Sequence, residues 1–162
     1  MIAKKVLLVG NFGVGKTSLI RRFVSNEFSE DYISTIGVRV STKLIQVQEQ
    51  EIKLLIWDVA GTKDDEKVPK AYFLGAHAAM YVFDLSEEET YRNLEAQLEN
   101  VKALSGLEHF VVVGNKKDLL TSEEVESVLK AIPLNIDLVT SAKEDDNVED
   151  AFMSLAMQSL NK

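Results

Sequence analysis

Nine residues near the start of the chain have the types and spacing needed to hold a chain of phosphates. Residues 10–18 read GNFGVGKTS and fit the pattern G-x-x-x-x-G-K-[ST]. Glycines in such a loop let backbone N–H groups turn inward around an anion. Lys16 then reaches the terminal phosphates, and the Thr17 hydroxyl can take a Mg²⁺ ion. We expect further phosphate contacts from the rest of this loop, namely Phe12, Gly13, Val14, Gly15 and Ser18.

A second short pattern would place an acidic group beside the same phosphates. Asp58 directly follows the predicted strand 52–57, and Gly61 comes three residues later. An acidic residue at this point can hold a Mg²⁺ ion through water. Gly61 can offer its N–H to a terminal phosphate, because it has no side chain to block the approach.

A third pattern could read a nucleobase. Asn115, Lys116 and Asp118 follow the apolar run 110–113. The carboxylate of Asp118 could accept hydrogen bonds from both N1–H and N2–H₂ of guanine, whereas adenine offers no such pair of donors. Asp118 therefore argues against an ATP-dependent enzyme. Backbone N–H groups after a later strand could meet the guanine O6, and they belong to Ser141, Ala142 and Lys143.

The elements that must position these groups alternate along the chain. Apolar and alternating runs predict strands at 6–9, 38–47, 52–57, 78–83, 110–113 and 136–140. Amphipathic spacing predicts helices after the phosphate loop, after a capping box formed by Ser86 and Glu89, and from 148 to the end. Pro69 and Gly75 suit the start and end of a helix at 69–75, and we expect a short helix at 122–131. This order predicts an α/β fold with a six-stranded, mostly parallel sheet, one antiparallel edge hairpin and five helices on both faces. Ligands of such folds bind at the carboxyl ends of the strands.

Composition limits the classes of protein to which this chain can belong. Its 162 residues suit a single domain over 1–162. The net charge of −8 disfavours nucleic acid as a partner. The chain contains no cysteine, so we expect neither disulfides nor a lipid anchor in it. No run reaches the roughly 18 apolar residues of a membrane span. We expect a cytoplasmic monomer.

Taken together, these motifs resemble the Ras superfamily of small GTPases, and residues 32–38 and 72–76 look most like its Rab branch. The resemblance implies a P-loop NTPase G domain that binds GTP or GDP with Mg²⁺. It implies that Thr35 and Asp58 join Thr17 at the metal, that Phe28 packs against the guanine, and that Asn115 braces the phosphate loop. Lys116 would lay its alkyl stem along the base. Effector and regulator proteins would bind through residues 30–40 and 60–72.

Two residues depart from the family pattern, and they bear on catalysis. Phe12 stands where most members have a small residue, and Thr62 stands where a glutamine usually orients the attacking water. The catalytic group would be Lys16, Thr35, Gly61 and Thr62. We expect a guanine-nucleotide switch that hydrolyses GTP slowly; the alternative is a non-hydrolysing GTP-binding scaffold. Because the chain ends without a tail or a lipid-accepting cysteine, either a truncated chain or a prokaryotic source is expected.

Overall fold

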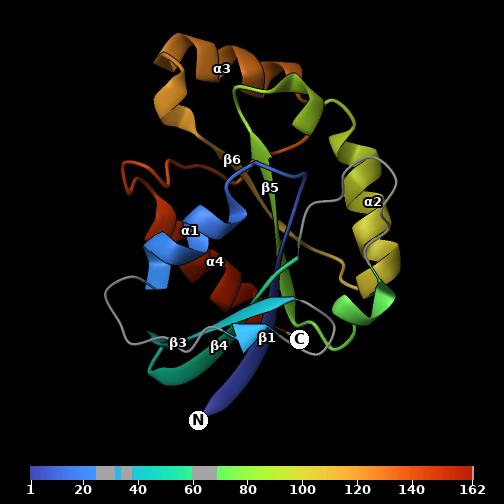
Figure 1. Cartoon of the computed structure of the whole chain (residues 1–162), viewed down its shortest axis with the longest axis vertical. Coiled ribbons are helices and arrows are strands. Elements are labelled where there is room, and N and C mark those ends of the chain that lie inside the picture. Colours follow the sequence, from blue (N-terminus) through green and yellow to red (C-terminus); the bar gives the residue numbers. More distant parts are fainter. Residues whose placement is uncertain (25–31, 34–37, 60–68, 162) are drawn as a thin grey trace.

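The computed structural model describes residues 1–24, 32–33, 38–59 and 69–161. Within them, seven strands form one sheet in the order β2-β3-β4-β1-β5-β6-β7 (Figure 1). The pairs β2–β3 and β3–β4 are antiparallel, and all the others are parallel. The strands are β1 (Ile2–Val9), β2 (Tyr32–Ile33), β3 (Arg39–Val47), β4 (Gln50–Asp58), β5 (Ala78–Asp84), β6 (Val111–Asn115) and β7 (Leu138–Val139).

Helices cover both faces of this sheet. The α-helices of the described residues are α1 (Lys16–Val24), α2 (Leu94–Ser105), α3 (Ser122–Ala131) and α4 (Val148–Leu160). Figure 1 shows α1 and α4 on one side of the sheet and α2 on the other, with α3 near the carboxyl ends of the central strands. The described residues also contain three single 3₁₀ turns: η1 (Lys70–Tyr72), η2 (Glu88–Thr90) and η3 (Lys117–Leu119). The predicted fold class is confirmed.

The core lies in two layers because neighbouring residues of a strand point to opposite faces. Val6 and Leu8 of β1 pack toward α1 and α4, whereas Leu7 and Val9 pack toward α2 and α3. Phe23 of α1 stacks on Phe152 of α4 with ring centroids 4.2 Å apart. Alternation along one strand therefore joins both helical layers to the same sheet and makes it a rigid platform for the loops above it.

Some local predictions need correction. The helix expected at 69–75 is only the 3₁₀ turn η1. Gly75 is left-handed (φ 74°) and ends the segment, so too few residues remain to form the hydrogen bonds that would offset the free-energy cost of nucleating a helix. The capping box at Ser86 does not form. Instead, the Ser86 N–H and hydroxyl both donate to the Asp84 carboxylate, at 2.8 and 2.6 Å.

A capping box does form at α3. The Thr121 hydroxyl accepts from the Glu124 N–H at 3.2 Å, and the Glu124 carboxylate accepts from the Thr121 N–H at 2.9 Å. The short strand β2 falls in a stretch expected to be loop. Tyr32 and Ile33 are both residue types that favour strands, and they pair with the exposed edge of β3.

Candidate functional site

The loop between β1 and α1 has the tight backbone that its glycines predict. Gly10 has φ +148°, and a Cβ atom there would lie 2.1 Å from the Val82 carbonyl oxygen. Gly15 has φ +102°, and its Cβ would lie 2.3 Å from the amide nitrogen of Asn115. Any larger residue would collide at both positions. The loop is therefore a cradle that only glycine permits, pressed between β5 and the end of β6.

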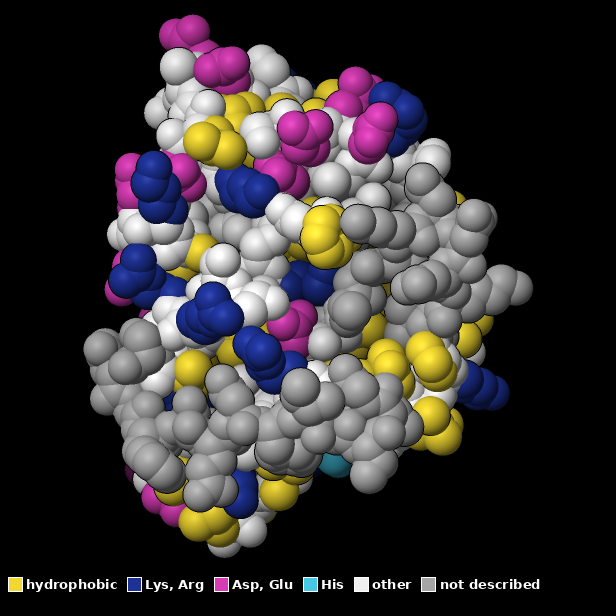
Figure 2. Space-filling view, in the orientation of Figure 1, with side chains coloured by type: hydrophobic (Ala, Val, Ile, Leu, Met, Phe, Trp, Pro, Cys, Tyr) yellow, Lys and Arg dark blue, Asp and Glu magenta, His cyan; other side chains and the backbone are white. Residues whose placement is uncertain are grey.

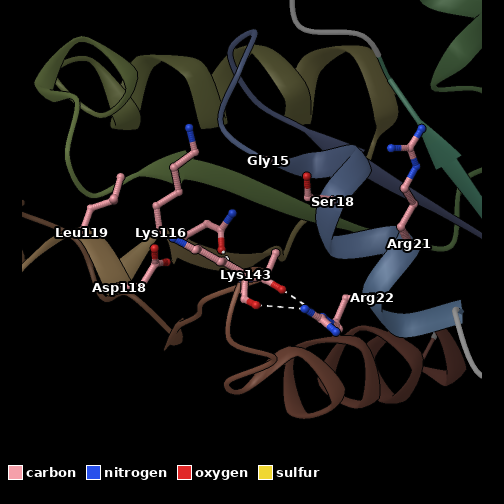
Figure 3. Close-up of a pocket in the computed structure, with 10 residues that line it drawn as sticks. Gly15, Ser18, Arg21, Arg22, Lys116, Asp118, Leu119 and Lys143 are labelled. Atoms are coloured by element: carbon pink, nitrogen blue, oxygen red, sulfur yellow. Dashed lines mark hydrogen bonds between the residues drawn. The ribbon is translucent and has the colours of Figure 1, made fainter.

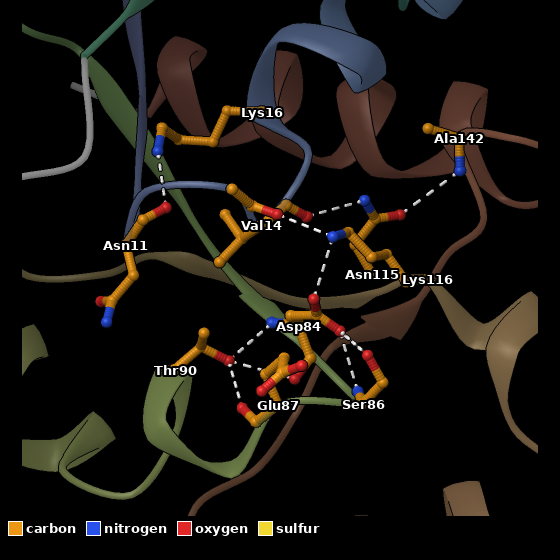
Figure 4. Close-up of polar contacts among 11 residues, drawn as sticks. Asn11, Val14, Lys16, Asp84, Ser86, Glu87, Thr90, Asn115, Lys116 and Ala142 are labelled. Atoms are coloured by element: carbon orange, nitrogen blue, oxygen red, sulfur yellow. Dashed lines mark hydrogen bonds and ion pairs between the residues drawn. The ribbon is translucent and has the colours of Figure 1, made fainter.

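Lys16 begins α1 and turns back over this loop. Its Nζ donates to the Gly10 carbonyl at 2.9 Å and to the Asn11 carbonyl at 3.0 Å, and Figure 4 shows the contact with Asn11. Only 6% of the residue is exposed. Burial lowers the pKa of this ammonium to about 8, although the nearby Asp58 carboxylate acts in the opposite direction. The loop thus holds a partly desolvated cation, and an anion bound there would relieve its cost.

Thr17 and Asp58 bring oxygen atoms together next to Lys16. The Thr17 hydroxyl donates to Asp58 Oδ2 at 2.5 Å, which joins α1 to the last residue of β4. A hydroxyl and a single carboxylate suit Mg²⁺, which usually takes one or two carboxylates and completes its shell with water and substrate phosphates. No group of three or more His, Cys, Asp or Glu side chains that could hold a metal occurs in the described part of the chain.

Asn115 ties together three segments that are far apart in sequence. Its Nδ2 donates to the Val14 carbonyl at 3.0 Å. Its Oδ1 accepts from the Thr140 hydroxyl at 2.9 Å and from the Ala142 N–H at 3.3 Å. The side chain is buried. Asn115 therefore braces the phosphate loop against the segment that follows β7.

Lys116 makes a second brace to the loop. Its Nζ donates to the Gly13 carbonyl at 2.7 Å and pairs with Asp84 Oδ2 at 3.0 Å. Figure 4 shows Asp84 between this cation and Ser86. Asp84 ends β5, as Asp58 ends β4, and it is almost fully buried. The same strand-end rule that selected Asp58 could have found Asp84, which the sequence reading missed.

Asp118 lies at the end of the site away from Lys16, beside the segment that follows β7. Its Oδ1 accepts from the buried Ser141 hydroxyl at 2.7 Å, so the segment after β6 and the segment after β7 meet there. A cavity of about 570 Å³ opens beside it, within the range of small-molecule sites (Figure 3). Its lining combines predicted with unpredicted residues: Gly15, Ser18, Arg21, Arg22, Asn115, Lys116, Asp118, Leu119, Ala142 and Lys143.

Basic side chains surround this opening although the chain is acidic overall. Arg21, Arg22, Lys116 and Lys143 all line the cavity. Figure 2 shows basic side chains spread over α1 and the neighbouring loops, with acidic ones gathered toward α3. Such a field favours a polyanionic ligand at this edge of the sheet.

The described residues therefore bring most of the predicted site together at one edge. Phe12 lies in the same loop, with 66% of its surface exposed. Four predicted residues lie outside the part of the chain that the structure describes, and they are Phe28, Thr35, Gly61 and Thr62. Three lining residues were missed, because none stands in a pattern that singles it out: Arg21, Arg22 and Leu119.

The site combines a tight glycine-rich loop, a buried lysine and a cavity at the strand ends. This combination defines a P-loop nucleotide-binding domain. The Ras family model matches residues 5–161. The GTP-binding protein ypt1 of Schizosaccharomyces pombe (strain 972 / ATCC 24843) is 38% identical over 160 residues, which covers 95% of this chain and 78% of that protein.

The chain belongs to the Ras family. It is a small GTPase, and its resemblance to the Rab branch is confirmed. The family is one of GTP-binding switches, and its membership gives no support to the alternative of a non-hydrolysing scaffold. Among the described residues, no helix is long and apolar enough to cross a membrane.

Proposed function

We propose that this small GTPase is a switch that binds GTP and GDP together with Mg²⁺ and hydrolyses GTP slowly. The observation that carries the proposal is the convergence of two half-sites at one sheet edge. Lys16 and the glycine cradle would form the phosphate half, and Asp118 with Ser141 would form the base half. Asn115 and Lys116 hold the two halves in register through the carbonyls of Val14 and Gly13.

Asp118 would supply the specificity for guanine. Its Oδ1 already accepts one hydrogen bond from Ser141, and an ionised carboxylate has lone pairs for further donors. Guanine would present two such donors, N1–H and N2–H₂. A base without them would leave a desolvated carboxylate with unmade hydrogen bonds, which is a strong basis for rejection. Ala142 and Lys143 would complete the base pocket, and Phe28 would pack against the ring.

Thr17, Asp58 and Thr35 would hold the metal ion. Thr17 and Asp58 already contact each other at 2.5 Å, so the hydroxyl would bind the ion directly and the carboxylate would hold it through water. A bound Mg²⁺ would neutralise the charge of the β- and γ-phosphates. Phosphate contacts would come from Gly13, Val14, Gly15, Lys16 and Ser18.

Hydrolysis would proceed by in-line attack of water on the γ-phosphate. Lys16 would stabilise the charge that develops on the transferred phosphoryl group, and its burial strengthens that interaction. Gly61 and Thr35 would add N–H and oxygen contacts. Thr62 is too short to orient the water as a glutamine does. The exposed ring of Phe12 belongs to the loop that would hold the phosphates, so it would crowd that water.

The output of the switch would be a change of order in residues 30–40 and 60–72. Contacts to the γ-phosphate would hold these segments in the GTP state, and hydrolysis would release them. Regulator and effector proteins would read the difference there.

The rate of hydrolysis tests this proposal. The intrinsic rate of Ras itself is about 3–5 × 10⁻⁴ s⁻¹, and we expect roughly tenfold less, which is ~1.4 kcal/mol of extra barrier. Phosphate release under single turnover should be measured for the parent, Phe12→Gly, Thr62→Gln and the double variant. The double variant should gain more than the sum of the single changes, because both residues would act on one water. A parent rate at the Ras value, or additive effects, would show that another group positions the water.

A further inference from the structure

Arg22 links the helix that follows the phosphate loop to the segment that would receive the base. It lies in the last turn of α1, and it reaches across to residues 142 and 143. Its Nε donates to the Ala142 carbonyl at 2.9 Å, and a terminal guanidinium nitrogen donates to the Lys143 carbonyl at 2.9 Å (Figure 3). One side chain thus holds two consecutive carbonyl groups that are 120 residues away in sequence.

A general helix-end charge does not explain this arrangement. Arg21 lies in the same last turn, so it already supplies positive charge to the carboxyl end of α1. Arg22 adds a directed contact: its planar guanidinium presents two donors side by side to two neighbouring acceptors. A lysine would offer the same charge without that geometry.

Fixing these carbonyls also fixes the N–H groups of the same segment. The Ala142 carbonyl and the Lys143 N–H belong to one planar trans peptide and point in opposite directions. Because Arg22 holds this carbonyl, the Lys143 N–H must face away from the guanidinium. The next N–H, that of Glu144, donates to the Ser141 hydroxyl at 3.0 Å, and that hydroxyl donates to Asp118. Arg22 therefore sets the orientation of a peptide beside the base-reading carboxylate.

We propose that Arg22 is a positioning residue for base recognition. It holds the peptide between Ala142 and Lys143 so that the Lys143 N–H faces the O6 atom of guanine, since the Ser141 and Ala142 N–H groups already donate to the Asp146 carbonyl and to Asn115 Oδ1. It also couples this segment mechanically to α1 and the phosphate loop. This inference rests on the proposed guanine site. It goes beyond that site because it predicts a residue that contributes to reading one particular atom of the base without touching the base itself.

The test compares three nucleotides that differ at single positions of the ring. GDP has both O6 and the 2-amino group; IDP keeps O6 and lacks the 2-amino group; 6-thio-GDP keeps the 2-amino group and replaces O6 by sulfur, a weak acceptor. Dissociation constants should be measured by competition against fluorescently labelled GDP. The variants are Arg22→Ala, Arg22→Lys and, as a matched control, Arg92→Ala, which removes an exposed arginine that pairs with Glu88 at 3.9 Å.

Arg22→Ala should weaken GDP and IDP by the same factor, about tenfold, which corresponds to ~1.4 kcal/mol. The same variant should weaken the binding of 6-thio-GDP by no more than about twofold, because the hydrogen bond from the backbone N–H to position 6 of the base is already weak in that ligand. Arg22→Lys should remain closer to Arg22→Ala than to the parent, and Arg92→Ala should match the parent with all three ligands. If Arg22→Ala does not fold, Arg22→Lys carries the same comparison.

Other outcomes would overturn the inference. An equal loss for all three nucleotides would mean that Arg22 stabilises the fold or the phosphate half. Unchanged affinities would mean that the segment 141–143 keeps its orientation without Arg22. Both outcomes leave the guanine site itself intact, whereas a parent protein that fails to bind GDP would refute the proposed function and this inference with it.

Discussion

Replacing Lys16 by methionine should stabilise the nucleotide-free protein while destroying its phosphate site. Lys16 is 6% exposed, and burial lowers its pKa from 10.5 to about 8. At 1.36 kcal/mol per pH unit, this difference means that carrying the charge costs the folded state roughly 3 kcal/mol at pH 7. Methionine has a similar length and no charge, so Lys16→Met should recover up to about 3 kcal/mol. The gain will be smaller to the extent that the bonds to Gly10 and Asn11 contribute.

The pH dependence of stability tests whether the charge of Lys16 destabilises the folded protein. Between pH 8 and 10.5 the unfolded chain binds more protons at Lys16 than the folded chain does, so the stability of the parent rises across this window. Lys16→Met lacks that rise. The two proteins should therefore differ most at pH 7 and converge toward pH 10.5. At about 3 °C per kcal/mol for a domain of this size, the melting temperature at pH 7 should rise by up to roughly 10 °C.

The assay is urea and thermal unfolding of both proteins at several pH values, without nucleotide and with excess GDP. GDP should reverse the order, because bound ligand stabilises the parent by about 4 kcal/mol at a thousand times its Kd and leaves the variant unchanged. Lys130→Met is the control: this lysine is largely exposed, and its pair with Glu126 at 3.8 Å lies in solvent. A variant that is less stable than the parent at pH 7, or a difference that does not change with pH, would refute the reasoning.

Three further predictions concern the base, the metal and the braces. Asp118→Asn should weaken GDP binding sharply and improve XDP binding in a nucleotide competition assay; unchanged GDP affinity would refute base reading by this carboxylate. Thr17→Asn should lower GTP affinity in Mg²⁺, and EDTA should speed nucleotide release from the parent; insensitivity to both would exclude Thr17 and Asp58 as the metal site. Asp84→Asn removes the buried charge that pairs with the partly exposed Lys116, so GDP should dissociate several times faster and unfolding should require about 1–3 kcal/mol less. A dissociation rate equal to that of the parent would show that Lys116 holds Gly13 unaided.

The sequence was sufficient to place the main parts of the site. Glycine spacing, a buried strand and an amphipathic helix predicted the loop 10–18, and carboxyl ends of parallel strands meet at one edge of a sheet. Asp58, Asn115 and Asp118 therefore had to lie close to the loop. The structure places Asp58 against Thr17, Asn115 against the Val14 carbonyl and Asp118 against Ser141, because each short pattern agrees with the fold around it. Their roles in binding a ligand stay predictions.

The braces could not be predicted in the same way. Arg22 contacts residues 142 and 143, and nothing in its neighbourhood distinguishes it from Arg21. The capping box at Ser86 failed because a nearer acceptor, the Asp84 carboxylate, takes the Ser86 N–H that the Glu89 carboxylate would accept. Pattern reading cannot rank such competitors, because their distances depend on the packed fold.

The most direct test of the central claim is to identify the nucleotide that the purified protein carries. The protein should be isolated in Mg²⁺, denatured, and its released nucleotide separated by HPLC and identified by mass. We predict close to one equivalent of GDP or GTP per chain, absent from Lys16→Met prepared in the same way. An adenine nucleotide, or no nucleotide even after incubation of the parent with excess GDP and Mg²⁺, would contradict the account.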